Sequence, residues 1–214
     1  GTAPAPSYPG SLKELEGSLP PEEYQRIEKA CDSFCSFIDA VSAMELGNNI
    51  AFYIGQGNVR GRVMGFDDGK PTPEQMEEMK QWFRQAMECG YLGFTTGLVY
   101  APSVYASEEE LVELAKVLKK YDALLTVHMR NEGPRIFQAV DEMIDIPRRS
   151  GVHLQISHLK LMGKPQWGRS QELLDKIEAA RQEGMTITCD QYPYTATSTS
   201  MTALLPKWAH DGGV

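Results

Sequence analysis

The chain has 214 residues, and 21 basic against 29 acidic side chains give it a net charge of −8. This balance argues against a nucleic-acid partner, which would require a basic surface. No apolar stretch approaches the roughly 18–20 residues that cross a bilayer, so no membrane partner is expected either. The first ten residues, GTAPAPSYPG, lack the basic and apolar regions of a signal peptide. Because the chain starts at glycine and stops just after DGG, we expect it to be a section of a longer protein.

The first 45 residues predict an N-terminal loop and helix. Proline and glycine punctuate residues 1–20, which indicates a loop. From Pro21 to about Ala43, acidic residues in the first turn and apolar residues at helical spacing predict one helix. Residues 46–214 then form the main predicted domain.

The main domain predicts a regular alternation of strands and helices. Strands are expected in NIAFYIGQG, YLGFTTGLVY, ALLTVHM, VHLQISHLK and MTITCDQYPY. Helices are expected in TPEQMEEMKQWFRQAMECG, SEEELVELAKVLKKY, PRIFQAVDEMIDIPRRSG and SQELLDKIEAARQEG. Pro73 and Gly90 bracket the first of these helices, and Ser107 with Glu110 predicts a capping box on the second. After a longer first step, the strands recur about every 30 residues, the length of one βα unit.

Five βα units with strands buried on both faces predict an α/β protein with a parallel sheet. They fit either an open doubly wound sheet or a section of a (β/α)8 TIM barrel. The barrel is favoured because polar residues gather at or just past the strand ends, where barrels place their active face. These residues are His128, Arg130, His158, Lys160, Asp190, Tyr192 and Tyr194. Gly55, Gly57 and Gly61 do not have the GxGxxG spacing of a dinucleotide site.

The positions of the four cysteines in the sequence predict that all of them are reduced. Cys31, Cys35, Cys89 and Cys189 are scattered, and only the first two are near neighbours, one helical turn apart. A CxxxC zinc pair would need other ligands nearby, and none is close in sequence. Buried free thiols in a cytoplasmic protein fit this pattern best.

His128 and His158 lie 30 residues apart at the ends of successive predicted strands. Neighbouring barrel strands bring side chains of the same register together, so the two imidazoles could share one cation, with zinc the expected metal. A lone strand histidine is more often a satisfied core residue, and the spacing alone leaves both interpretations open. The loop TATSTS that follows Tyr192 and Tyr194 could bind a polar substrate or could be a solvated turn.

Seven motifs together resemble one known family. In chain order they are GQGNVR, GYLGFTTGLVYAP, HMRNEG, ISHLKLMG, QWGRS, CDQYPYTATSTS and LLPKW. They resemble the N-acyl-D-amino-acid deacylase (D-aminoacylase) branch of the amidohydrolase superfamily. The resemblance implies a metal-dependent (β/α)8 barrel, of which this chain would contain strands three to seven. It also implies hydrolysis of the amide bond of an N-acyl-D-amino acid by a metal-activated water.

Site residues follow from the same resemblance. His128 and His158 would be zinc ligands on the fifth and sixth family strands. Lys160, Tyr192 and Ser198 would hold the substrate carboxylate, and Tyr100 would line the substrate pocket. Arg130 is included among the substrate-binding residues as a further cation, although the resemblance does not define its role.

Parts of the family pattern are missing from this chain. The HxH of the first strand, the bridging cysteine or glutamate of the second and the aspartate after the eighth do not occur. We therefore expect no catalytic residue in this section, because the general-base aspartate would lie beyond residue 214. We also expect the zinc site to be incomplete and the section to be inactive by itself. The alternative is a noncatalytic α/β ligand-binding or assembly module. A section of a barrel also has two open sheet edges, NIAFYIG and MTITCDQYPY. They could pair in a homodimer, be covered by residues 1–45, or lead to aggregation, and the homodimer is the favoured outcome.

Overall fold

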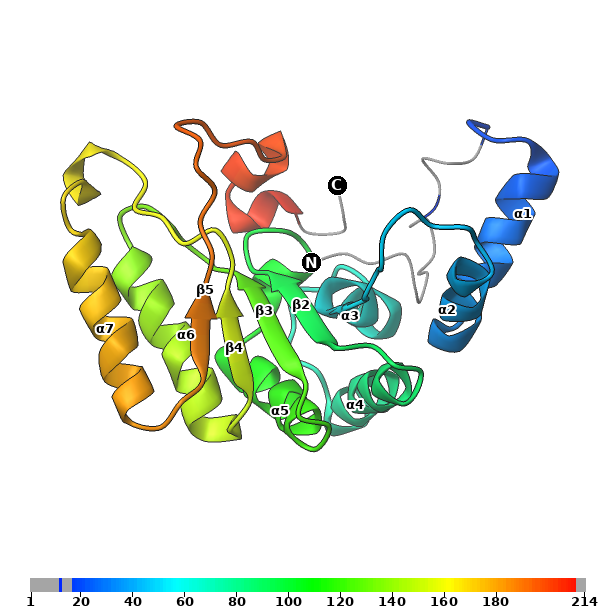
Figure 1. The fold of residues 1–214 in the computed structure, drawn as a ribbon, viewed down its shortest axis with the longest axis horizontal. Helices are drawn as coiled ribbons and strands as arrows, with labels where there is room; N and C mark the ends of the chain where they lie inside the picture. Colours follow the sequence, from blue (N-terminus) through cyan, green and yellow to red (C-terminus); the bar gives the residue numbers. More distant parts are fainter. Residues whose placement is uncertain (1–11, 13–16, 211–214) are drawn as a thin grey trace.

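The computed structural model describes residue 12 and residues 17–210. This part of the chain contains a five-stranded parallel sheet in the order β1-β2-β3-β4-β5 (Figure 1). The strands are Ile54–Gly55, Gly93–Gly97, Leu124–His128, His153–Ile156 and Ile187–Cys189. The predicted α/β fold, a five-strand section of a (β/α)8 barrel, is confirmed, and β1 and β5 are its edges as expected.

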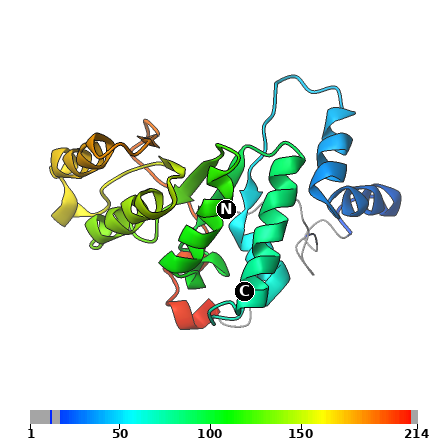
Figure 2. The same ribbon diagram turned by 90° about the horizontal axis from the view of Figure 1, so that it is seen from below.

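Four helices follow the strands around the outer face of the sheet (Figures 1 and 2). They are α4 (Pro73–Glu88), α5 (Glu108–Lys119), α6 (Ile136–Ser150) and α7 (Ser170–Gln182). Most of the predicted sequence signals at their ends are present. Thr72 and Gln75 form a full capping box before α4, and Gly151 ends α6 with a left-handed φ of 72°. Among the described residues, no helix is long and apolar enough to cross a membrane.

Side-chain alternation along the strands separates an apolar outer face from a polar inner face. One register row crosses all five strands and is fully buried against the helices: Ile54, Phe94, Leu125, Leu154 and Ile187. The next row points the other way, to the side that lines the interior of a closed barrel, and from β2 to β5 it is Thr95, Thr126, Gln155 and Thr188. The sheet is therefore built to face helices on one side and a polar site on the other.

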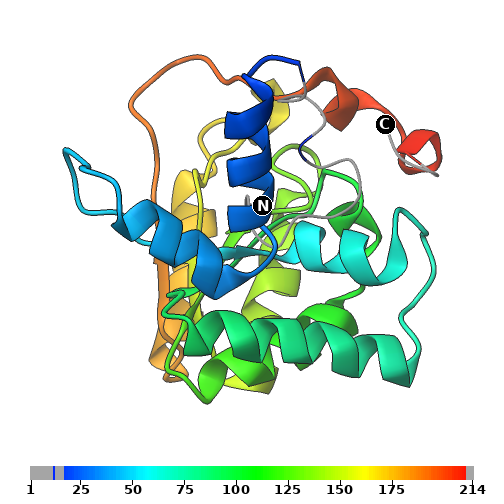
Figure 3. The same ribbon diagram turned by 90° about the vertical axis from the view of Figure 1, so that its right-hand side faces the viewer.

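The prediction of one continuous first helix is wrong, because the structure has two helices there. The chain forms α1 (Pro21–Ala30) and α2 (Phe34–Ser42), separated by a turn in which the Ser33 hydroxyl accepts the Ser36 N–H at 3.1 Å. Phe34 is buried with edge-on contacts to Trp82 and Tyr91, and it anchors α2 beside α4 (Figure 3). The break lets α2 turn this side chain into the core.

The prediction of four reduced thiols is also wrong. Cys35 of α2 and Cys89 at the end of α4 form a disulfide across 54 residues of sequence. Cys31 is free and buried, and Cys189 is free and exposed. The two cysteines that meet are distant in sequence, and the packing of α2 on α4 brings them together.

All five strands are shorter than the predicted stretches, and the two edge strands differ most. The apolar run from Asn49 to Gly57 contributes only Ile54–Gly55 to the sheet, and α3 (Gln56–Met64) begins at the next residue. The chain leaves the sheet after β5 at Asp190. The short 3-10 helices η2 (Ser103–Tyr105), η3 (Lys164–Gln166), η4 (Met201–Leu204) and η5 (Lys207–His210) lie in the connections that follow strands.

A buried ion pair explains why α3 replaces the end of the first strand. The Arg60 side chain is fully buried, and its Nε lies 3.4 Å from Glu110 Oε2. Gln56 Nε2 donates to Glu110 Oε1 at 2.9 Å. Because Glu110 serves these two partners, the predicted Ser107–Glu110 capping box is only half formed, with the Ser107 hydroxyl accepting the Glu110 N–H. Burial raises the pKa of Glu110, and Arg60 and Gln56 oppose that rise.

Candidate metal centre

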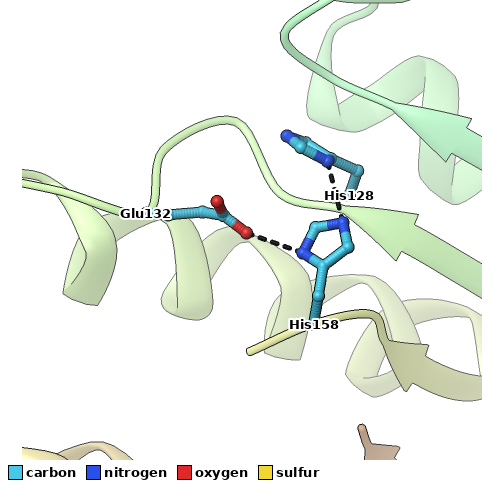
Figure 4. Close-up of side chains that lie close together, drawn as sticks. All are labelled: His128, Glu132 and His158. Atoms are coloured by element: carbon cyan, nitrogen blue, oxygen red, sulfur yellow. Dashed lines mark hydrogen bonds and ion pairs between the residues drawn. The ribbon is translucent and has the colours of Figure 1, made fainter. Parts of the chain in front are cut away.

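Two histidines meet at the carboxyl ends of neighbouring strands. His128 is the last residue of β3, and His158 follows β4 by two positions. His128 Nδ1 lies 2.9 Å from His158 Nε2, and the ring centroids are 4.5 Å apart (Figure 4). Each ring thus turns one nitrogen toward the same point, an arrangement that can hold one cation between them.

The backbone of His158 is held in an uncommon conformation. Its φ is +43°, in the left-handed region that few residues other than glycine adopt. The His158 N–H donates to Asp190 Oδ1 at 2.6 Å, and Gln155 Nε2 donates to Asp190 Oδ2 at 2.7 Å. Asp190, just past β5, therefore fixes the turn that presents the imidazole. Strained backbone of this kind recurs at functional sites.

Glu132 completes a three-residue cluster that the sequence analysis missed. It comes from the loop after β3, and its carboxylate atom Oε1 lies 2.8 Å from His158 Nδ1 and 2.5 Å from Lys160 Nζ. One ligand atom from each of His128, Glu132 and His158 lies within 4.8 Å of the others. The signal in the sequence was an acidic residue inside HMRNEG, four positions after a predicted metal ligand.

The protonation states of the cluster suit a metal. Burial lowers the pKa of His128 to about 4, although the Glu132 charge opposes the effect. The imidazole is therefore neutral at pH 7 and keeps a lone pair for a metal. Burial alone would raise the pKa of Glu132, but hydrogen bonds from His158 and Lys160 outweigh it and the pKa is lowered. The carboxylate is ionised at neutral pH.

The donor set fits zinc. Nitrogen ligands at about 2.0–2.1 Å in a tetrahedral arrangement lie roughly 3.3 Å apart. The two facing nitrogens are 2.9 Å apart, so a small displacement of either ring would admit an ion. Imidazole and carboxylate are both common zinc ligands.

Two of the predicted substrate residues, Lys160 and Tyr100, lie next to the histidines, and a third, Tyr192, contacts Lys160. The Lys160 ammonium lies over the Tyr192 ring, 5.4 Å from its centroid. The Tyr100 ring lies 5.3 Å from the His128 ring, and its hydroxyl is 2.5 Å from the Thr199 hydroxyl. Ser198 is exposed in the loop that carries Thr199, which crosses above the ends of the strands (Figure 1).

Arg130 is engaged elsewhere. Its guanidinium donates to both carboxylate oxygens of Glu142 at 2.9–3.2 Å, and to the carbonyl oxygens of Val104 and Ala106 at 2.9 and 2.8 Å. Glu142 belongs to α6, and the two carbonyls lie in the connection after β2. Through these contacts Arg130 links the connection after β2 to helix α6.

A hollow of about 450 Å³ adjoins the cluster on its β5 side. Its lining is mainly apolar and includes Leu159, Trp167, Leu173 and Leu174, with Lys160 and Asp190 among its polar residues. The two histidines do not line it. The chemistry of the site therefore lies next to this hollow, at the strand ends.

The chain is similar to known deacylases over most of its own length. It is 34% identical over 197 residues to a D-aminoacylase of Alcaligenes xylosoxydans xylosoxydans, covering 89% of this chain and 40% of that protein. It is 36% identical over 173 residues to an N-acyl-D-glutamate deacylase of the same organism, covering 81% of this chain and 35% of that protein. No protein-family model matches the chain.

Solved structures give the same result. An N-acyl-D-glutamate deacylase of Bordetella bronchiseptica, complexed with zinc and a phosphonate inhibitor, superposes with a TM-score of 0.77 at 34% identity, covering 90% of this chain and 39% of that one. A D-aminoacylase structure superposes with a TM-score of 0.72 at 32% identity, covering 82% and 38%. The resemblance predicted from the motifs is confirmed over this section, and the chain spans about 40% of the length of the relatives it matches.

Proposed function

We propose that this chain is an internal section of a zinc-dependent N-acyl-D-amino-acid deacylase, a hydrolase of linear amide bonds. One observation carries the proposal: His128 Nδ1 and His158 Nε2 converge to 2.9 Å at the ends of adjacent strands. They do so in a sheet that superposes on a zinc-bound deacylase.

In this proposal His128 and His158 are zinc ligands. Bound zinc would polarise the substrate amide carbonyl and lower the pKa of a water molecule. Lys160, Tyr192 and Ser198 would bind the substrate carboxylate, because an ammonium and hydroxyl groups form charge-assisted hydrogen bonds with it. Tyr100 would line the pocket beside His128. Arg130 would add positive charge beside this set, with its guanidinium held by Glu142 and by two carbonyl oxygens.

The section is expected to be inactive by itself. It contributes two histidines, and the remaining ligands and the general-base aspartate are expected in other parts of the longer chain. Loss of a general base alone lowers a rate by about 10²–10⁴-fold.

Zinc binding to this chain tests the site. We expect weak, saturable binding, measured by competition with a chromophoric chelator, and its loss in His128→Ala and in His158→Ala. His153→Ala is the matched control, because His153 starts β4 and lies 3.6 Å from Asp122, at the opposite end of the strand. Equal binding by all three variants would refute the metal site.

Activity tests the function. The longer chain that contains this section should hydrolyse N-acetyl-D-amino acids and leave their L enantiomers intact, and the section alone should hydrolyse neither. Binding without turnover by the longer chain would favour the noncatalytic module.

We also propose that the section forms a homodimer through its sheet edges, because within residues 17–210 β1 and β5 each have a strand on one side only. The cellular location of the protein is predicted to be the cytoplasm. That prediction was based on reduced thiols, and the Cys35–Cys89 disulfide removes this support, since disulfides persist mainly in oxidising compartments. Trapping the thiols in intact cells before lysis would decide the location.

A further inference from the structure

The carboxylate of Glu132 lies against the side of the His158 ring that faces away from His128. Figure 4 shows the order across the cluster: Glu132, the His158 ring, then His128. Glu132 Oε1 is 2.8 Å from His158 Nδ1, while His158 Nε2 is 2.9 Å from His128 Nδ1. Each ring nitrogen of His158 therefore has a separate partner.

The contact with Glu132 fixes which ring nitrogen carries the proton. An ionised carboxylate only accepts hydrogen bonds, so a nitrogen 2.8 Å from it must donate. His158 is then protonated at Nδ1, and the Nε2 lone pair points to the place where the two histidines converge. The same logic makes His128 Nδ1 the donor in the His–His contact when no ion lies between them.

Lys160 favours the other tautomer. Its Nζ lies 3.1 Å from His158 Nδ1 and could donate to that nitrogen if the ring were protonated at Nε2. An Nε2–H would block the lone pair that a metal needs. Glu132 prevents this arrangement because the same oxygen also accepts from Lys160 Nζ, at 2.5 Å.

The three side chains are largely shielded from water. The exposed fractions of the side chains are 9% for Glu132, 14% for Lys160 and 27% for His158. Shielding strengthens charge-assisted hydrogen bonds, so the contact is stronger than a similar one at the surface.

We propose that Glu132 is a positioning residue that sets both functional neighbours with one oxygen atom. It holds His158 in the tautomer that binds a metal through Nε2. It also accepts a hydrogen bond from the Lys160 ammonium, which keeps that ammonium from donating to His158 Nδ1. The inference rests on the proposed zinc site for its effect on metal affinity, and on geometry alone for the tautomer. Carboxylate partners of metal-binding histidines typically affect metal affinity by about 10–100-fold.

The test uses this chain, uniformly labelled with ¹⁵N, at pH 8. In the metal-free protein, long-range ¹H–¹⁵N spectra of the histidine rings should show His158 protonated at Nδ1. In Glu132→Gln the charge is lost, Lys160 can donate to the ring, and the His158 signals should shift toward the Nε2–H tautomer. Zinc affinity should fall about 10–100-fold in the same variant.

Glu113→Gln is the matched control. Glu113 also holds two cationic groups with one carboxylate, Lys80 and Lys116 at 2.6 Å each, but it belongs to the helix layer. It should leave the His158 tautomer and zinc affinity unchanged.

Three results would overturn the inference. One is an Nε2–H tautomer in the unsubstituted protein, a measurement that does not depend on any variant folding. Another is unchanged zinc affinity in Glu132→Gln. The third is complete loss of zinc binding with an unchanged tautomer, which would make Glu132 a direct ligand. Failure of the unsubstituted chain to bind zinc would instead refute the proposed site, while the tautomer would still test the role of Glu132.

Discussion

At Gly93, the first residue of β2 passes so close to β3 that an added Cβ would lie 1.8 Å from the Leu124 carbonyl oxygen. Its φ of +156° adds a second reason for glycine. We expect Gly93→Ala to lower the free energy of unfolding by about 2 kcal/mol or more, because the two strands must separate to admit the methyl group. Urea unfolding followed by circular dichroism measures the change.

Gly184→Ala separates the cost of the positive φ from the cost of the steric clash with a neighbouring strand. Gly184 has a φ of +93° but no atom within 4 Å of an added Cβ, so this variant reports the cost of the backbone conformation alone, about 1–2 kcal/mol. Gly93→Ala should cost more than Gly184→Ala. The reverse order would show that β2 and β3 can separate without penalty.

Individual site residues differed in how far the sequence could predict them. His128 and His158 were predictable because the register of parallel strands places strand ends side by side. Glu132 reaches His158 through the path of a loop, which has no period to read. Arg130 was identified as a cation at the rim, but its partner Glu142 lies on a different element, and no sequence pattern links the two.

At the scale of elements, Glu113 links two neighbouring helices. It lies on α5 and bonds Lys80 of α4 and Lys116 of its own helix. Hydrogen bonds from Lys116 and Lys80 lower the pKa of Glu113 to about 2. Because an unfolded glutamate has a pKa of about 4.3, the stabilisation is fully present above that pH and is lost as the pH falls toward 2.

Glu113→Gln tests this linkage. The difference in unfolding free energy between the unsubstituted chain and the variant should be constant from pH 7 to pH 5, and should shrink steadily below pH 4. Urea unfolding at a series of pH values measures it. A difference that does not depend on pH would mean that the carboxylate charge contributes nothing.

The disulfide links α2 to α4, and its loss should be measurable. Cys35→Ser is expected to lower the free energy of unfolding by about 2–4 kcal/mol. In the unsubstituted chain, a thiol reagent under denaturing conditions should detect two thiols, Cys31 and Cys189, before reduction. After reduction it should detect all four cysteines. Cys189→Ser, at an exposed free thiol, should not change stability, and four reactive thiols before reduction would contradict the disulfide.

Elements with strong local signals were predicted well. Helices α4 to α7 all have apolar periodicity. Side-chain caps begin α4 and α5, and a glycine follows α4, α6 and α7, so local sequence specifies their type and much of their limits. The predictions of secondary structure were wrong where tertiary contacts override the local sequence pattern. The break after Ala30 lets Phe34 and Cys35 pack on α4, and α3 begins at Gln56 because Gln56 and Arg60 must reach the buried Glu110.

At the scale of the whole molecule, the open edges should govern association. β1 has two residues in the sheet and β5 has three, so each edge can form few backbone hydrogen bonds with another chain. We therefore expect a monomer–dimer equilibrium that depends on concentration, with the dimer favoured at high micromolar concentration. Sedimentation equilibrium measures it, and a strictly monomeric chain across that range would refute pairing at the edges.

Sheet order in the described part of the chain follows sequence order, so each of its strands pairs only with the strands just before and after it. Interactions of this kind resemble those of repeat proteins, where stability is a sum of units and of interfaces between neighbours, and unfolding can begin at either end. β3 has neighbours on both sides, whereas Asp190, which holds the turn of His158, follows the terminal strand β5. Local unfolding from the β5 end would release His158 while β3 still held His128. The His158 ring would then become exposed to solvent before the His128 ring does.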